Sequence, residues 1–414
     1  MSEDNKKVPV LRFRGFKDDW EQRKLSEVAN HRGGTAIEKY FKEDGRYKVI
    51  SIGSYGLDSK YVDQNIRAVS NEVTDGRVVH NGELTMVLND KTANGTIIGR
   101  SLLIEQDNQY IINQRTEIIS PKENFDSEFA YTILNGPFRE KVKRIVQGGT
   151  QIYVNYSAVE NLALELPCFE EQQKIGTLFK QLDTTITLHQ RKLDLLKQMK
   201  KGFLQRMFPK SDEKVPELRF DDFISEWKQR KLGTLANFSK GNGYKKNDLI
   251  ERGSPIILYG RLYTKYETII NRVDTFVEKK DKSVVSEGNE VIVPASGEKS
   301  EDISRAAVVG KSGIILGGDL NIIKPNKKID STFLALTISN GTQQKEMSKR
   351  AQGKSVVHLH NSDLKQVNLL YPQKEEQQKI GSFFKQLDDI IILRQEKLDK
   401  LVTLKKSYLQ KLFI

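Results

Sequence analysis

Two long segments of the chain carry apolar residues at helical spacing. In residues 170–208 and 375–413, apolar side chains recur at steps of three or four residues. That period places one apolar stripe on one face of an α-helix. About 39 residues at 1.5 Å each give a rod of roughly 58 Å. A rod of this kind cannot bury its stripe alone, so we expect the two helices to pair as a coiled coil. The chain between them must return, which favours an antiparallel pair.

These two segments are copies of one sequence. Residues 170–208 match 375–413 at 24 of 39 positions, and residues 8–30 match 215–237 at 13 of 23. The stretches between the paired segments show little similarity. The layout therefore predicts two similar modules related by a pseudo-twofold, which a partner present in two copies can read.

The dissimilar stretches read as mixed α+β structure. Short runs of β-branched and aromatic residues between glycine and asparagine turns predict strands near 101–104, 110–112, 116–119, 254–259, 290–293 and 313–316. Helices are expected at 127–146 and 330–351, because each has an acidic start and a basic end. The predicted fold class is α+β, with two pseudo-twofold-related modules separated by two long antiparallel helices that form an intramolecular coiled coil.

The formal net charge of +12 favours a polyanionic partner, most often nucleic acid, over a basic protein without one. Arg and Lys can neutralise phosphates and read guanine, whereas Gln and Asn suit adenine. In the first module the candidate DNA-binding residues are Lys39, Tyr40, Arg46, Tyr55, Lys60, Lys91, Thr92, Asn94, Arg115, Arg144, Gln147 and Tyr153. In the second they are Lys240, Tyr244, Lys245, Lys246, Arg261, Lys265, Ser296, Lys299, Arg305, Arg350, Gln352, Lys354 and His358.

The start of each long helix, Glu-Glu-Gln-Gln-Lys-Ile-Gly, is identical in the two copies. Helix capping needs only a polar first turn, so capping does not explain the identity. Either a shared partner surface or a recent duplication accounts for it. The candidate partner-docking residues are Glu171, Gln172, Gln173, Glu376, Gln377 and Gln378.

No group of residues in the sequence predicts catalysis or metal binding. The chain lacks a phosphate loop, a nucleophile elbow and the Asn-Pro-Pro-Phe/Tyr motif of amino-methyltransferases. Its one cysteine, Cys168, excludes an internal disulfide and a thiolate zinc site. The N-terminal sequence lacks the apolar core of a signal peptide, and the sequence has no run of ~18 apolar residues. We expect a soluble, cytoplasmic protein that is not itself an enzyme.

The order of module, a proline (in Leu-Pro in the first copy) followed by Glu-Gln-Gln-x-Ile, and long helix, given twice, resembles the specificity subunit of type I restriction–modification enzymes. The matching residues are Pro167, Glu171, Gln172, Gln173 and Ile175, and again Pro372, Glu376, Gln377, Gln378 and Ile380. The entrances Trp20–Leu25 and Trp227–Leu232 also resemble the family's module starts. The resemblance covers nearly all of residues 8–414.

The resemblance implies target-recognition domains at 1–166 and 210–371, and conserved helices at 167–209 and 372–414. Each domain would read one half of a bipartite target in double-stranded DNA. Two modification subunits would bind S-adenosylmethionine and methylate adenine, and two restriction subunits would use ATP and Mg for cleavage, with no cofactor on this chain. A solitary DNA-binding protein, such as a regulator or an antirestriction decoy, is the alternative. A single-chain nuclease or methyltransferase is a third class, which the missing motifs disfavour.

Overall fold

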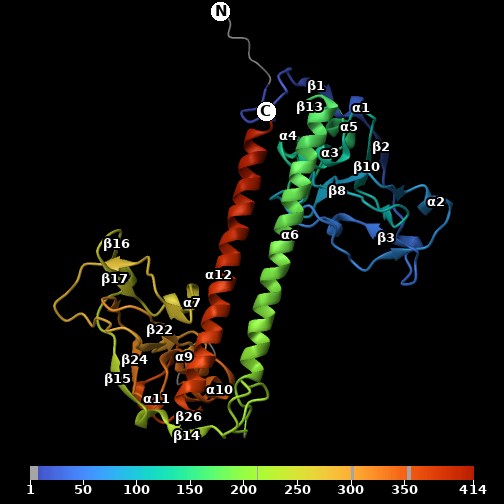
Figure 1. Cartoon of the computed structure of the whole chain (residues 1–414). Coiled ribbons are helices and arrows are strands. Elements are labelled where there is room, and N and C mark those ends of the chain that lie inside the picture. The colour runs from blue at the N-terminus through green and yellow to red at the C-terminus, as the bar shows by residue number, and fades with distance from the viewer. Residues whose placement is uncertain (1–7, 212, 300–302, 352–355) are drawn as a thin grey trace, which may run out of the picture. The chain divides into compact units, whose positions relative to one another are not determined.

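The computed structural model describes residues 8–211, 213–299, 303–351 and 356–414, which form two compact units (Figure 1). The first unit contains the described residues up to His189 together with Lys397–Ile414, and the second contains Gln190–Glu396. Each unit therefore holds one α+β module and one part of each long helix.

Both predicted long helices are present. They are α6 (Phe169–Arg206) and α12 (Lys374–Lys411), each of 38 residues. Both carry two glutamates in the first turn and end with a basic residue, the arrangement that the helix dipole favours. The bounds confirm the predicted segments to within two residues.

The two helices run antiparallel in each unit. In the first unit Lys405 Nζ, near the end of α12, lies 2.5 Å from Asp183 Oδ1 in the first half of α6. In the second unit Lys200 Nζ, near the end of α6, lies 2.5 Å from Asp388 Oδ1 in the first half of α12. These four residues occupy equivalent positions in the two repeats, so each unit contains the same interhelical ion pair. The predicted antiparallel pairing is confirmed.

The first module is built from four small sheets, with strand orders β1-β13, β2-β10-β6-β8, β4-β3-β9-β5 and β11-β12-β7. Its strands are β1 (Glu21–Lys24), β2 (Ala29–Gly33), β3 (Tyr47–Ile50), β4 (Arg67–Ala68), β5 (Val78–Val79), β6 (Leu84–Val87), β7 (Asn89–Asp90), β8 (Ser101–Leu103), β9 (Tyr110–Ile112), β10 (Thr116–Pro121), β11 (Gln147–Gly148), β12 (Ile152–Tyr153) and β13 (Ala163–Leu166). Its helices are α1 (Leu25–Val28), η1 (Glu38–Tyr40), η2 (Ile52–Ser54), α2 (Glu72–Asp75), α3 (Ser127–Asn135), α4 (Pro137–Arg144) and α5 (Tyr156–Val159).

The second module has matching sheets, with strand orders β14-β26, β15-β24-β20-β22-β18, β16-β19-β17-β23 and β21-β25. Its strands are β14 (Lys228–Lys231), β15 (Ala236–Lys240), β16 (Leu249–Ile250), β17 (Ser254–Ile257), β18 (Ile269–Ile270), β19 (Phe276–Val277), β20 (Val291–Pro294), β21 (Ser296–Gly297), β22 (Ala307–Val309), β23 (Ile315–Leu316), β24 (Leu320–Pro325), β25 (Val357–His358) and β26 (Asn368–Tyr371). Its helices include η3 (Leu232–Thr234), η4 (Lys246–Asp248), α7 (Arg261–Thr264), α9 (Ser331–Ser339), α10 (Gly341–Arg350) and α11 (Asn361–Lys365).

The two modules share their strand pairing although their sequences differ. In the two-stranded sheets, Glu21 of β1 faces Leu166 of β13 in the first module, and Lys228 of β14 faces Tyr371 of β26 in the second. Each module also pairs two strands in parallel, β3 with β9 and β17 with β23. The predicted α+β class is therefore confirmed, and the two modules repeat one backbone framework.

An aromatic cluster in each unit joins the module to the ends of the long helices. In the first unit the Trp20 ring lies 6.1 Å from Phe413, just beyond the end of α12. In the second unit the Trp227 ring lies 6.1 Å from Phe208, just beyond the end of α6. All four residues are buried. The repeated entrance motif and the repeated helix end thus form one core in each unit.

The two helices expected at 127–146 and 330–351 are each divided in two, which corrects that prediction. Asp126 and Asp330 cap the first pieces through their side chains, as their acidic starts suggested. The first helix breaks at Pro137, which begins α4 because proline fits only the first turn of a helix. The second breaks at Gly341, whose φ of +70° favours glycine.

Candidate nucleic-acid interface

A small exposed β-ribbon lies in the first module. Tyr153 of β12 pairs with Asn89 of β7 on one side and with Gln147 of β11 on the other. The Tyr153 side chain is exposed. Gly148 turns the chain with a φ of +101°, and a Cβ at this position would lie 2.2 Å from the carbonyl oxygen of Gln151. Only glycine fits at position 148, which explains the first glycine of the Gln-Gly-Gly sequence there.

Six of the predicted DNA-binding residues gather on and beside this ribbon. Lys91, Thr92 and Asn94 follow β7 and are exposed. Arg115 Nη1 donates to the side-chain oxygen of Asn89 at 2.9 Å, in the amide orientation that satisfies both amide atoms. We call this set the first ribbon surface: Lys91, Thr92, Asn94, Arg115, Gln147 and Tyr153. It combines cationic, amide and aromatic groups that suit contact with nucleic acid.

The second module has a ribbon in the same register. Ser296 of β21 faces His358 of β25, at the positions equivalent to Asn89 and Tyr153. His358 is exposed, and its ring stacks with that of His360 at 6.3 Å. Ser296 itself is buried, so we give the name second ribbon surface to the exposed residues Lys299 and His358. The predicted residues Gln352 and Lys354 lie outside the described residues.

Several other predicted residues are exposed or half-buried but lie on other elements. Arg144 ends α4, three residues before the first ribbon, and Arg350 pairs with Glu346 within α10. Lys265 pairs with Asp274 at 2.8 Å. The remaining members of this group are Lys39, Tyr40 and Arg46, which lie on or next to η1 and β3, Lys240, which ends β15, Lys245 and Lys246, which lie at the start of η4, and Arg305.

Four predicted residues are buried: Tyr55, Tyr244, Arg261 and Ser296. Tyr55 belongs to a hydrophobic cluster and donates to Thr85 Oγ1 at 3.0 Å. Arg261 forms ion pairs of 2.7 Å with both Glu267 and Asp274. These side chains stabilise the module. Their burial could not be predicted, because the residue type in a loop does not show whether its side chain faces solvent.

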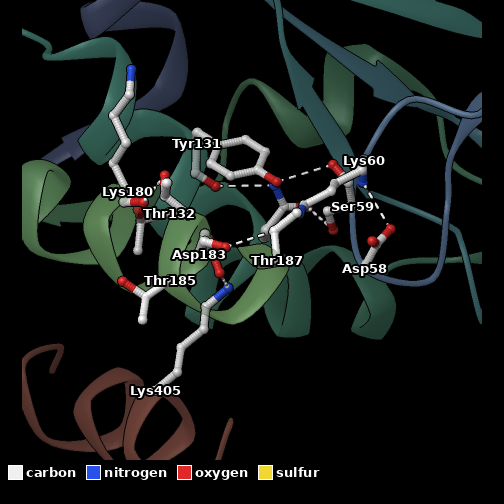
Figure 2. A network of polar contacts seen from close by, with 12 residues as sticks. Asp58, Ser59, Lys60, Tyr131, Thr132, Lys180, Asp183, Thr185, Thr187 and Lys405 are labelled. Carbon is white, nitrogen blue, oxygen red and sulfur yellow. Dashed lines mark hydrogen bonds and ion pairs between the residues drawn. The ribbon is translucent and has the colours of Figure 1, made fainter. Parts of the chain in front are cut away.

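Lys60 is directed to the long helix. Figure 2 shows its ammonium group donating to Thr187 Oγ1 of α6, while its own amide donates to Asp58 Oδ1 at 3.1 Å. Tyr131 on α3 fastens the same loop by donating to the carbonyl oxygen of Ser59 at 3.0 Å. In this conformation Lys60 joins the module to α6 and does not extend the first ribbon surface.

The second glutamate of each identical helix start, Glu171 or Glu376, is buried inside its own unit. Arg12 donates twice to the Glu171 carboxylate, from Nε at 2.9 Å and from Nη2 at 2.8 Å. Arg219 does the same to Glu376, with both distances 2.7 Å. The glutamate side chains are 1% and 0% exposed. The arginines were missed as functional candidates, although both lie in the repeated Leu-Arg-Phe sequence.

The first glutamine of each start is also buried and satisfied. Gln172 Oε1 accepts from the amide of Asp126 at 3.1 Å, and Gln377 Oε1 accepts from the amide of Asp330 at 2.8 Å. Their side-chain amides donate to backbone carbonyls at Asn124 and Pro167, and at Lys328 and Pro372.

Gly176, four residues after Gln172, lets α6 pack closely against the start of α3. A Cβ at Gly176 would lie 2.7 Å from the amide nitrogen of Phe129. Internal packing therefore explains much of the sequence identity between the two helix starts. Gln173 and Gln378 are exposed, and partner docking there stays a prediction.

One buried carboxylate outside the ribbon has a polar setting of its own. Glu117 Oε1 lies 2.7 Å from His31 Nδ1, and His31 Nε2 lies 3.4 Å from Glu160. Burial raises the pKa of Glu117 above its ordinary value. Among the residues that the structure describes, no three His, Cys, Asp or Glu side chains gather in a way that would hold a metal ion. None of the described helices combines the length and apolarity needed to cross a bilayer.

Two modules with one backbone framework and different exposed ribbons define a duplicated recognition protein. The family profile described as type I restriction modification DNA specificity domain matches residues 17–198 and 224–403. The specificity subunit of the type I restriction enzyme MjaVIII of Methanocaldococcus jannaschii is 20% identical over 404 residues, covering 94% of this chain and 91% of that protein.

Solved structures share the fold. The S subunit of a type I restriction–modification system from M. genitalium has a TM-score of 0.67 at 16% identity, covering 98% of this chain and 99% of that one. A chain from a study of complex assembly and conformational transition of the type I R-M system has a TM-score of 0.52 at 16% identity, covering 95% and 97%. The chain belongs to the type I restriction–modification DNA specificity family, and its place in such a system is that of the specificity subunit.

Proposed function

We propose that each recognition domain, 1–166 and 210–371, reads one half of a bipartite target in double-stranded DNA through its ribbon surface. The observation that carries the proposal is the shared register with different side chains: Tyr153 opposite Asn89 in one module and His358 opposite Ser296 in the other. A β-ribbon fits the major groove, where each base pair presents its own pattern of donors and acceptors. The net charge of +12 supports binding to the phosphate backbone.

We further propose that this chain supplies recognition and that its partners supply the chemistry. Two modification subunits with S-adenosylmethionine would methylate adenine, and two restriction subunits with ATP and Mg would cleave. The repeated helix starts support two copies of one partner, because each presents the same exposed residues, such as Gln173 and Gln378. The structural relative from a study of type I complex assembly supports partners of this class.

The test is a module exchange in the assembled complex. Residues 31–150 are replaced by the corresponding stretch of another specificity subunit, and methylated adenines are mapped by sequencing. We expect one half of the target to change and the other to stay. A change in both halves would contradict the modular reading.

The chain alone, without modification subunits, serves as the comparison. Tight target-specific binding by the chain together with failure to retain a modification subunit would instead support a solitary DNA-binding protein.

A further inference from the structure

The loop of residues 91–99 carries three of the six residues of the first ribbon surface. It joins β7 to β8, and Lys91, Thr92 and Asn94 are exposed on it. Ile98, near its end, is fully buried in the core of the first unit. Gly95 and Gly99 have φ values of +60° and +69°, a region that favours glycine. The loop therefore has a defined conformation and a buried anchor.

A buried aspartate holds the loop from one side. Asp90 is 2% exposed, and its Oδ1 accepts from both the amide and the hydroxyl of Thr92 at 2.9 Å. Its Oδ2 accepts from the amide of Ile97 at 2.8 Å. Burial acts to raise the pKa of Asp90, but these hydrogen bonds outweigh it and hold the pKa below its ordinary value. The charged carboxylate thus closes the loop by joining its two ends.

A buried arginine holds the loop from the other side. Arg139 of α4 is 7% exposed, and its Nε donates to the carbonyl oxygen of Ile98 at 2.9 Å. Its Nη2 donates to the carbonyl oxygens of Gly95 at 3.0 Å and Thr96 at 2.8 Å. Burial lowers the pKa of Arg139 to about 10. The guanidinium therefore bonds to three carbonyl oxygens of the loop backbone, and no carboxylate of the described residues pairs with it.

The two buried charges act on the same loop. Burying an ionised group is unfavourable unless hydrogen bonds replace its water. Asp90 bonds to loop amides and Arg139 to loop carbonyls, and no described hydrogen bond joins them to one another. Their hydrogen bonds consequently hold the conformation of the loop.

We propose that Asp90 and Arg139 are positioning residues that preform loop 91–99 and so determine how the first module reads its half of the DNA target. This inference rests on the proposed function. A loop that is ordered before binding loses less conformational entropy when DNA binds. Lys91 suits a phosphate and Asn94 suits an adenine edge, and both contacts require a fixed backbone.

The second module lacks this device at the equivalent place. Ser296 and Gly297 follow β20 as Asn89 and Asp90 follow β6, and the strand register is the same. Glycine therefore stands where the first module has Asp90. The proposed effect is confined to the first half of the target.

The experiment uses the full chain in complex with its modification subunits. Asp90→Asn and Arg139→Met test positioning, because the amide of Asn would oppose a loop N–H donor and Met removes three hydrogen bonds. Lys91→Ala and Asn94→Ala test contact with DNA while leaving the two anchors in place. Methylation rates are measured on DNA altered in the first or the second half, as assigned by the module exchange.

We expect Asp90→Asn and Arg139→Met to lower discrimination at the first half by roughly tenfold, with the second half unchanged. Amide hydrogen exchange should accelerate at Thr92 and Ile97 in Asp90→Asn, since those amides lose their acceptor. This exchange is measured on the free chain and keeps the test informative if methylation is too weak to follow.

Glu117→Gln is the matched control, a buried carboxylate of the same module that does not touch the loop. It should leave first-half discrimination and loop exchange unchanged. If the contact variants weaken first-half reading while Asp90→Asn and Arg139→Met leave it and the exchange unaltered, the positioning inference is overturned and the proposed function stands. If all four variants leave both halves unaltered, the loop is not at the DNA, and the ribbon proposal fails with it.

Discussion

The repeated segments and the ribbons of this protein use sequence identity in opposite ways. Several residues that the repeats keep at equivalent places are internal, such as Glu171 and Glu376, although the identical Gln173 and Gln378 are exposed. The ribbons keep the same backbone register and change the side chains, as Tyr153 and His358 show. Much of the identity therefore coincides with side chains that stabilise their own unit, whereas the exposed side chains of the ribbons differ.

The comparison teaches that an identical segment in a duplicated protein need not be a partner surface. Buried ion pairs, satisfied amides and close helix contacts also restrict residue choice. The reverse holds for the ribbons, since a shared strand register with different exposed side chains allows two modules to recognise different partners without a change of fold. The following variants test this contrast, from the largest expected effect to the smallest.

Breaking the buried ion pairs should cause the largest loss of stability, and a similar loss in the two units. Arg12→Met and Arg219→Met each leave a buried glutamate without its partner, which costs roughly 3–5 kcal/mol. Urea unfolding measures the loss, and the two tryptophans report separately, because Trp20 lies in the first unit and Trp227 in the second. A Trp→Phe background at one site lets the other report alone.

The controls for the ion pairs are Gln173→Ala and Gln378→Ala, which are exposed and should change stability by about 0.5 kcal/mol or less. An Arg12→Met midpoint equal to that of the parent would show that Glu171 is not fixed by this pair.

The ribbon residues should give an intermediate and unequal effect. Tyr153→Ala should weaken recognition of one half of the target by about 1–3 kcal/mol, and His358→Ala should weaken the other half. Binding is measured at fixed salt on DNA altered in one half at a time. Ile224→Ala, an exposed apolar residue outside both ribbons, is the control. Loss at both halves from a single variant would contradict separate reading.

Acid should give the smallest effect, and an equal one in both modules. The hydrogen bond from Arg67 lowers the pKa of Asp63 to about 2, and that from Lys265 lowers the pKa of Asp274 to about 2. A pKa depressed by folding means that the stabilisation is present above about 3.8 and is lost as the pH falls to about 2.

Solvent screens both pairs, so the change should be a fraction of a kcal/mol. Across this pH window, the unfolding midpoint of the first unit should depend less on pH in Asp63→Asn than in the parent. The same should hold for the second unit in Asp274→Asn. Midpoints of the parent that do not move between these pH values would rule out the contribution.

Much of the fold could be predicted from sequence because periodic patterns are local. The stripe of residues 170–208 predicted α6, and the repeat predicted the second copy and the pseudo-twofold. The stretches expected to be helical at 127–146 and 330–351 each form two helices, because Pro137 and Gly341 interrupt them. The strand pairing could not be predicted, since register depends on contacts between distant residues.

The sequence predicted which residue types the candidate site contains, but not where in the fold those residues lie. Six loop residues came together on the first ribbon, but Tyr55, Tyr244 and Arg261 became buried, and Lys60 turned to Thr187. Residue type shows what a side chain can bind, whereas burial depends on the rest of the module. Asp90 and Arg139 were not predicted, because neither spacing nor repetition distinguishes them.

By itself, the sequence determined the duplication, the two long helices, the α+β class and the basic charge, because each is carried by residues close together in the chain or by composition. The tertiary structure alone decided which repeated residues are internal, which loop residues reach the surface together, and where Asp90 and Arg139 meet one loop. Those outcomes depend on hydrogen bonds and packing between segments far apart in sequence, and only the folded chain brings such segments into contact.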